Sequence, residues 1–138
     1  MIKCCLLILL IPAITLLCCC SRAPDDPDIA LEKQLIGTWK IQYNDSNVAG
    51  ELVSQYMPDY HASWQCTLAL PEQPPEQHTA HGVWKVEDGY LYFKFEESSI
   101  TDFPSGFSSA DMIVNVNEQE LTCIDSTSGE QYVKVRVQ

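Results

Sequence analysis

From Thr38 to the end of the chain, apolar and polar residues alternate with a period of two, and short turn signals interrupt the alternation. This period places successive side chains on opposite faces of a strand, so one face of the resulting sheet can be buried. An open sheet of this kind leaves two exposed edges, whereas eight strands can close into a barrel. We therefore expect an all-β, eight-stranded antiparallel up-and-down barrel. Its strands are predicted at 38–43, 51–57, 62–70, 79–87, 90–96, 111–116, 120–126 and 130–137.

A short helix is expected before the first strand, at 27–36. Asp26 is a good N-cap, Pro27 suits the first helical position, and Gly37 is a stop signal. In an up-and-down barrel, successive loops fall at alternate ends. The helix and the short turns, such as Asp88-Gly89, are then expected to close one end. The long loops are expected at the other, open end, at 44–50, 71–78 and 97–110.

The N-terminal residues read as a targeting segment. Lys3 precedes an apolar run that is short for a transmembrane helix, as in a secretory signal, although a short retained anchor is the alternative. Leu17-Cys18-Cys19-Cys20 resembles the lipobox of bacterial lipoproteins. The resemblance implies acyl chains (palmitate among them) on Cys20, or alternatively on Cys19, and attachment to a membrane without a spanning helix. The expected division is a signal peptide at 1–19, a solvated, lipidated tether at 20–28 and the barrel domain at 29–138.

A tryptophan stands at the start of the first predicted strand, in Gly37-Thr38-Trp39, and Arg136 lies on the last strand. This arrangement is similar to the Gly-x-Trp opening of the lipocalins and their bacterial lipocalin-like relatives, over roughly residues 30 to 138. The resemblance implies that Trp39 closes the floor of the barrel and that Arg136 packs over its ring, which is a favourable cation–π contact. The chain is short for a lipocalin and shows no match to the central Thr-Asp motif of that family.

The alternation also gives candidates for the barrel interior. They would either line an apolar cavity for one small ligand or fill a small barrel completely, and the sequence leaves both readings open. Phe103 and Phe107, in the long loop at 97–110, would form a lid or a partner-binding edge, or pin the loop by their own packing. The candidate cavity residues are Trp64, Leu68, Trp84, Leu91, Phe93, Phe95, Met112 and Val114.

Cys66 and Cys123 are the cysteines of the predicted domain. An exported protein meets an oxidising compartment, which favours a disulfide. The third and seventh strands of a round eight-stranded barrel face each other across it, which opposes one, because the two Cα atoms must come within about 7 Å. Pairing therefore stays open. His61, His78 and His81 are expected on the surface, without a metal.

The formal net charge of −11 at pH 7 argues against nucleic acid as a partner. Without a recognisable catalytic or cofactor-binding motif, the chain is not expected to be an enzyme or to need a cofactor. We expect a lipoprotein of the cell envelope, at the outer membrane facing the periplasm, that binds a small apolar ligand or lipid. The alternative is a protein-interaction module, such as a lysozyme inhibitor. Ser128-Gly129-Glu130-Gln131-Tyr132 resembles the Ser-Gly-x-x-Tyr element of C-type lysozyme inhibitor lipoproteins, but the Trp-x-Lys-Gly that follows it there is missing, and the element is expected to form the hairpin turn into the last strand.

Overall fold

The computed structural model describes residues 22–45 and 48–138, so the predicted lipidation sites Cys19 and Cys20 lie outside the described residues. In these described residues, one helix, α1 (Pro27–Leu35), precedes eight strands. The strands are β1 (Gly37–Asp45), β2 (Val48–Tyr56), β3 (His61–Ala69), β4 (Glu76–Glu87), β5 (Tyr90–Ser98), β6 (Ser108–Val116), β7 (Glu120–Asp125) and β8 (Gln131–Arg136).

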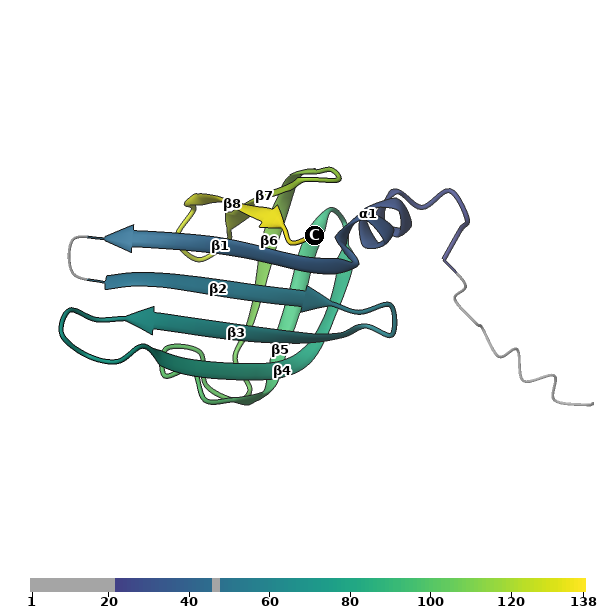
Figure 1. Cartoon of the computed structure of the whole chain (residues 1–138). Coiled ribbons are helices and arrows are strands. Elements are labelled where there is room, and N and C mark those ends of the chain that lie inside the picture. Colours follow the sequence, from purple (N-terminus) through teal and green to yellow (C-terminus); the bar gives the residue numbers. More distant parts are fainter. Residues whose placement is uncertain (1–21, 46–47) are drawn as a thin grey trace, which may run out of the picture.

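The strands pair antiparallel in chain order and form a closed barrel. Closure joins β1 to β8, where Trp39 pairs with Arg136 and Lys40 with Val135. The predicted fold class is therefore confirmed (Figure 1). Since α1 and every strand of the closed sheet lie after Arg22, the barrel is complete within the described part of the chain.

Two long connections, at 70–75 and 99–107, match the prediction, but the first expected loop is wrong. β1 and β2 form a long hairpin whose pairing continues through Asn44 and Ala49, inside the loop expected at 44–50. Asn44 and Asp45 are common turn residues, yet ladder hydrogen bonds hold them in a strand. Tertiary pairing overrides local preference here, as it often does in sheets.

The two ends of the barrel differ as predicted. Figure 1 shows α1 at one end, and the β3–β4 connection lies at the opposite end. The short β2–β3, β4–β5 and β6–β7 turns share the end with α1. We call the half of the barrel next to α1 the closed half and the other the open half. In the residues that the structure describes, no helix has the length and apolar character needed to cross a bilayer.

Most of the large, fully buried side chains of the core lie in the closed half. Its side chains come from the helix and from strands on all sides, so the floor of the barrel is filled. The side chains with almost no exposed surface here are Leu35, Trp39, Tyr56, Val86, Leu91 and Leu121.

Candidate functional site: barrel floor and interior cavity

Trp39 and Arg136 lie in contact at the floor, where the sequence placed them. The guanidinium carbon of Arg136 lies 4.1 Å from the centroid of the indole ring. The indole N–H donates to the carbonyl of Leu35 at 2.8 Å, and Arg136 donates to the carbonyl of Ile36 at 3.0 Å. The end of α1 is thus bonded to the first and last strands of the barrel.

Gly37 is required at this floor for two reasons. Its φ of 136° is one that residues with a side chain rarely adopt. A Cβ atom at this position would also lie 2.5 Å from Nη1 of Arg136. The Gly-x-Trp pattern therefore has a steric meaning, since glycine leaves the space in which the arginine covers the tryptophan.

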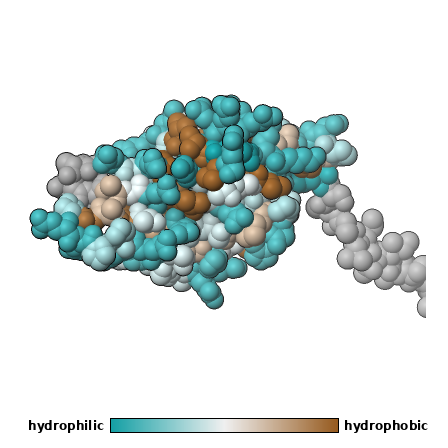
Figure 2. Space-filling view, in the orientation of Figure 1, coloured by the Kyte–Doolittle hydropathy of each residue, from teal (hydrophilic) through white to brown (hydrophobic). Residues whose placement is uncertain are grey.

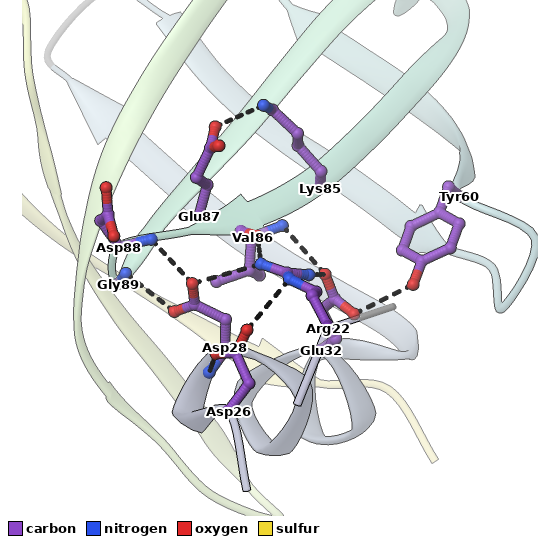
Figure 3. A network of polar contacts seen from close by, with 10 residues as sticks. All are labelled: Arg22, Asp26, Asp28, Glu32, Tyr60, Lys85, Val86, Glu87, Asp88 and Gly89. Carbon is purple, nitrogen blue, oxygen red and sulfur yellow. Dashed lines mark hydrogen bonds and ion pairs between the residues drawn. The ribbon is translucent and has the colours of Figure 1, made fainter. Parts of the chain in front are cut away.

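A second set of contacts, which the sequence did not indicate, attaches the segment before α1 to the barrel (Figure 3). Arg22 donates from Nη1 to Glu32 at 2.6 Å and from Nη2 to Asp28 at 3.2 Å. It also donates to the carbonyl of Val86, on β4, at 2.5 Å. Asp28 and Glu32 are both buried. Residues 22–25 of the predicted tether at 20–28 are exposed, but the side chain of Arg22 is bound to the closed half, and residues 27 and 28 belong to α1.

Asp28 and Glu32 extend these contacts to two turns of the barrel. Asp28 accepts hydrogen bonds from the backbone N–H groups of Asp88 at 2.7 Å and of Gly89 at 3.0 Å, in the β4–β5 turn. Glu32 accepts from the hydroxyl of Tyr60 at 3.1 Å, in the β2–β3 turn, and this bond raises the pKa of Tyr60. We call Arg22, Asp28, Glu32 and their partners the helix-anchoring network (Figure 3).

The open half encloses a cavity of about 430 Å³. Its walls are mainly apolar, and residues of the 99–107 loop complete them at the mouth. The lining residues are Ile41, Tyr43, Leu52, Trp64, Phe93, Phe95, Ile100, Phe103, Phe107, Ser109, Asp111, Asp125, Thr127, Ser128, Tyr132 and Lys134.

Aromatic rings form one continuous wall of this cavity. The centroids of Trp64 and Phe95 lie 4.4 Å apart, and those of Phe95 and Phe107 lie 5.7 Å apart. Phe103 follows at 4.9 Å from Phe107 and is 42% exposed. The two loop phenylalanines therefore continue the interior wall to the mouth, where a lid would lie.

The predicted interior residues divide into three groups. Trp64, Phe93 and Phe95 line the cavity. The second group belongs to the core, where Leu68 is partly buried and Trp84 and Leu91 are buried. The indole N–H of Trp84 donates to the carbonyl of Met57 at 3.0 Å.

Met112 and Val114 are the third group, and their prediction is wrong. They are 37% and 51% exposed and lie on the outer face. Asp111 and Ile113 take the inward positions instead, and a bulge between Ile113 and Asn115 shifts the alternation so that Val116 is buried.

A group of polar side chains stands in the cavity wall, and sequence reasoning missed it. We call Asp111, Tyr132 and Lys134 the inner polar cluster. The hydroxyl of Tyr132 donates to Oδ2 of Asp111. The amine of Lys134 donates to the hydroxyl of Ser54 at 3.0 Å and of Tyr56 at 3.5 Å, at the boundary with the closed half. The available signal was the inverted pattern of β8, in which polar residues point inward between exposed valines.

The two cysteines are buried and free. They lie on β3 and β7 and are not joined by a disulfide in the structure. Burial raises the pKa of Cys123 to about 11, so this thiol stays protonated and unreactive at neutral pH. His61 and His81 are exposed, and the described residues hold no group of three side chains suited to a metal ion.

Comparison with known proteins agrees with this architecture. No protein-family model matches the chain. No curated protein matches it either. Among solved structures, a lipocalin-like protein from Bacteroides uniformis superposes with a TM-score of 0.52 at 11% sequence identity. The match covers 75% of this chain and 99% of that one. At this identity the likeness concerns the fold alone, and it shows that the chain forms a barrel of the lipocalin-like type.

Proposed function

We propose that this protein is an exported lipoprotein whose barrel binds a small apolar ligand or lipid. The interior cavity carries the proposal. Its volume of about 430 Å³ lies in the range of small-molecule sites, and its mouth opens between loops at the end opposite α1. Transfer of apolar ligand surface from water onto Trp64, Phe93 and Phe95 provides roughly 25 cal/mol per Å².

The attachment to a membrane is proposed from the sequence alone. Leu17-Cys18-Cys19-Cys20 supports acylation at Cys20, or alternatively at Cys19, with Ser21 supporting sorting to the outer membrane. One acyl chain binds a bilayer only marginally, whereas several chains on one cysteine anchor a domain firmly. The acidic domain itself has no basic run for anionic lipid.

Mass spectrometry tests both parts of this proposal. The denatured mass of the protein from cell membranes should correspond to a chain that begins at Cys20 and carries acyl chains. The native mass of the barrel released by proteolysis before Arg22 should show an adduct that disappears on denaturation. A chain with an intact N-terminus would contradict the anchor, and a bare native mass that takes up no added apolar probe would contradict the binding function.

Two neighbouring serines offer a matched pair of variants for the same measurement. Ser109 lines the cavity, whereas Ser108 is exposed on the outer side of β6. Ser109→Phe should fill part of the cavity and abolish the adduct, and Ser108→Phe should leave it unchanged. Circular dichroism checks that both variants keep the barrel. Equal adducts in both variants would place the ligand elsewhere.

A protein-interaction module is the second candidate, and a specific observation favours it. The outer faces of β6 and β8 expose Met112, Val114, Val133 and Val135, and the exposed Val137 follows β8 directly. Figure 2 shows a hydrophobic patch where β8 lies in Figure 1, and patches of this kind often mark interaction sites.

The element that resembles lysozyme inhibitors gives this candidate little support. Ser128 and Gly129 form the turn between β7 and β8, and Gly129 has a φ of 74°. Tyr132 points inward and binds Asp111. A native mass without adduct, together with inhibition of lysozyme by the purified protein, would favour the second candidate over the first.

A further inference from the structure

The inner polar cluster contains a carboxylate that the protein does not satisfy. Asp111 is only 4% exposed, and its Oδ1 atom has no hydrogen-bond partner in the structure. Its other oxygen accepts from Tyr132. Burial raises the pKa of Asp111 and nearby Asp125 adds to this, while Tyr132, Lys134 and the hydroxyl of Ser109 oppose the shift. A buried acceptor without a partner is unfavourable, and a ligand that donates a hydrogen bond to it would recover the lost free energy.

Lys134 adds a donor on the same cavity wall. Its amine bonds to Ser54 and Tyr56, and it lies 5.8 Å and 5.6 Å from the ring centroids of Tyr56 and Tyr132. An ammonium group has three N–H donors, so these two hydrogen bonds leave one for a further acceptor. The cluster can therefore offer one acceptor and one donor to a molecule in the cavity.

The rest of the cavity selects against a fully polar molecule. Trp64, Phe93 and Phe95 present apolar rings, so most of a ligand must be apolar to fit against them. A pure hydrocarbon would leave Asp111 unsatisfied. A carboxylate head group would bring a second negative charge to Asp111, which is unfavourable in a buried site. A hydroxyl group donates one hydrogen bond and accepts others, and it carries no charge.

We propose that the cavity recognises an amphipathic alcohol, whose apolar body packs against the aromatic wall and whose hydroxyl donates to Oδ1 of Asp111 and accepts from Lys134. This inference rests on the proposed function and adds the head group that the site selects. Asp111 and Lys134 are then the specificity-determining residues, and Tyr132 positions the carboxylate.

Competition with an apolar fluorescent probe tests the inference on the protein from Arg22 to Gln138. N-phenyl-1-naphthylamine reports occupancy, and 1-decanol, decane and decanoate compete with chains of equal length. The wild type should bind 1-decanol at least about tenfold more tightly than decane or decanoate, because one hydrogen bond to a buried carboxylate is worth that factor. Asp111→Asn replaces the carboxylate with an amide, and the preference for 1-decanol over decane, measured within this variant, should fall to about twofold or less.

Asp102→Asn is the matched control, because Asp102 is exposed in the loop beside Phe103 and does not line the cavity. It should keep the wild-type preference. Equal binding of 1-decanol and decane, tighter binding of decanoate, or an unchanged preference in Asp111→Asn would overturn the head-group inference and leave the proposed function standing. If wild-type protein binds neither the probe nor any competitor, the proposed function itself fails.

Discussion

The closed and open halves of the barrel are built from the same eight strands but use their interior differently. In the closed half, Trp39 and Leu35 have no exposed surface, and α1 is bonded to the floor and to two turns. In the open half, aromatic rings form one wall of a cavity, Phe103 is 42% exposed, and Asp111 keeps an unsatisfied oxygen. In the function that we propose, stability and binding are therefore separated along the barrel axis. Filled regions contribute most to the global free energy of unfolding, and binding regions are drawn from the less stable end.

Replacement of one aromatic residue in each half should give the largest contrast. Trp39→Ala removes a fully buried ring, its hydrogen bond to Leu35 and its contact with Arg136. We expect a loss of about 3–5 kcal/mol in the free energy of unfolding. Phe103→Ala, at the mouth, should cost about 1 kcal/mol or less. Urea denaturation measures the free energy of unfolding of both variants, and the m-values should stay at that of the wild type. Losses of similar size would show that the two halves share the stability equally.

Two glycines, one in each half of the barrel, allow the closed and open halves to be compared at the level of the backbone. Gly37 and Gly106 have φ values of 136° and 88°, but only at Gly37 would a Cβ atom meet a neighbour, Nη1 of Arg136. Gly106→Ala should cost about 1–2 kcal/mol from backbone strain alone. Gly37→Ala should cost roughly 1 kcal/mol more, because the methyl group displaces Arg136 from Trp39.

A double-mutant cycle isolates the second effect. In an Arg136→Ala background, the two glycine variants should lose about the same stability. If Gly37→Ala keeps its extra cost there, the contact with Arg136 is not the cause.

The smallest expected effect is a pH dependence in the open half. The pKa of Asp111 in the folded state lies above its ordinary value of 3.8. Between pH 3.8 and the pKa of the folded state, the folded protein therefore binds more protons than the unfolded chain. This carboxyl therefore lowers the stability as the pH rises through that window. Relative to wild type, Asp111→Asn should gain stability as the pH rises above about 3.8, as measured by thermal unfolding over the acid range. A constant difference across this range would contradict the assignment.

Most of the fold could be predicted from the sequence, because alternation and turn chemistry act locally. Asp88-Gly89 marks the β4–β5 turn where it was expected, and Pro27 begins α1. The prediction failed where pairing overrides local preference. The β1–β2 hairpin extends through Asn44, and the bulge after Ile113 reverses the faces of β6, which no single-strand pattern reveals.

The site could be predicted only in part, and the reason is physical. Aromatic residues such as Trp64 and Phe95 can be predicted to lie in the interior, because they are large and apolar. Lys134 and Asp111 cannot be, because charged residues are seldom buried without partners, and neither was among the residues predicted for the interior. In β8 the usual rule is inverted, as Val133 and Val135 are exposed on either side of the buried Lys134. The helix-anchoring network was missed because contacts between Arg22 and β4 depend on the tertiary fold.

The bond between Arg22 and the closed half also determines how the domain would be mounted. In the lipid-anchored form that we propose, Ser21 alone separates Cys20 from Arg22. Two residue steps span at most about 7 Å. The floor of the barrel would therefore lie directly against the bilayer, and the linker would be too short to let the domain move away from it. The mouth would then face outward, roughly 20 Å or more from the lipid surface, given the rise along a tilted strand. Cargo would be exchanged with the aqueous space or an opposing partner, and not with the membrane that holds the protein.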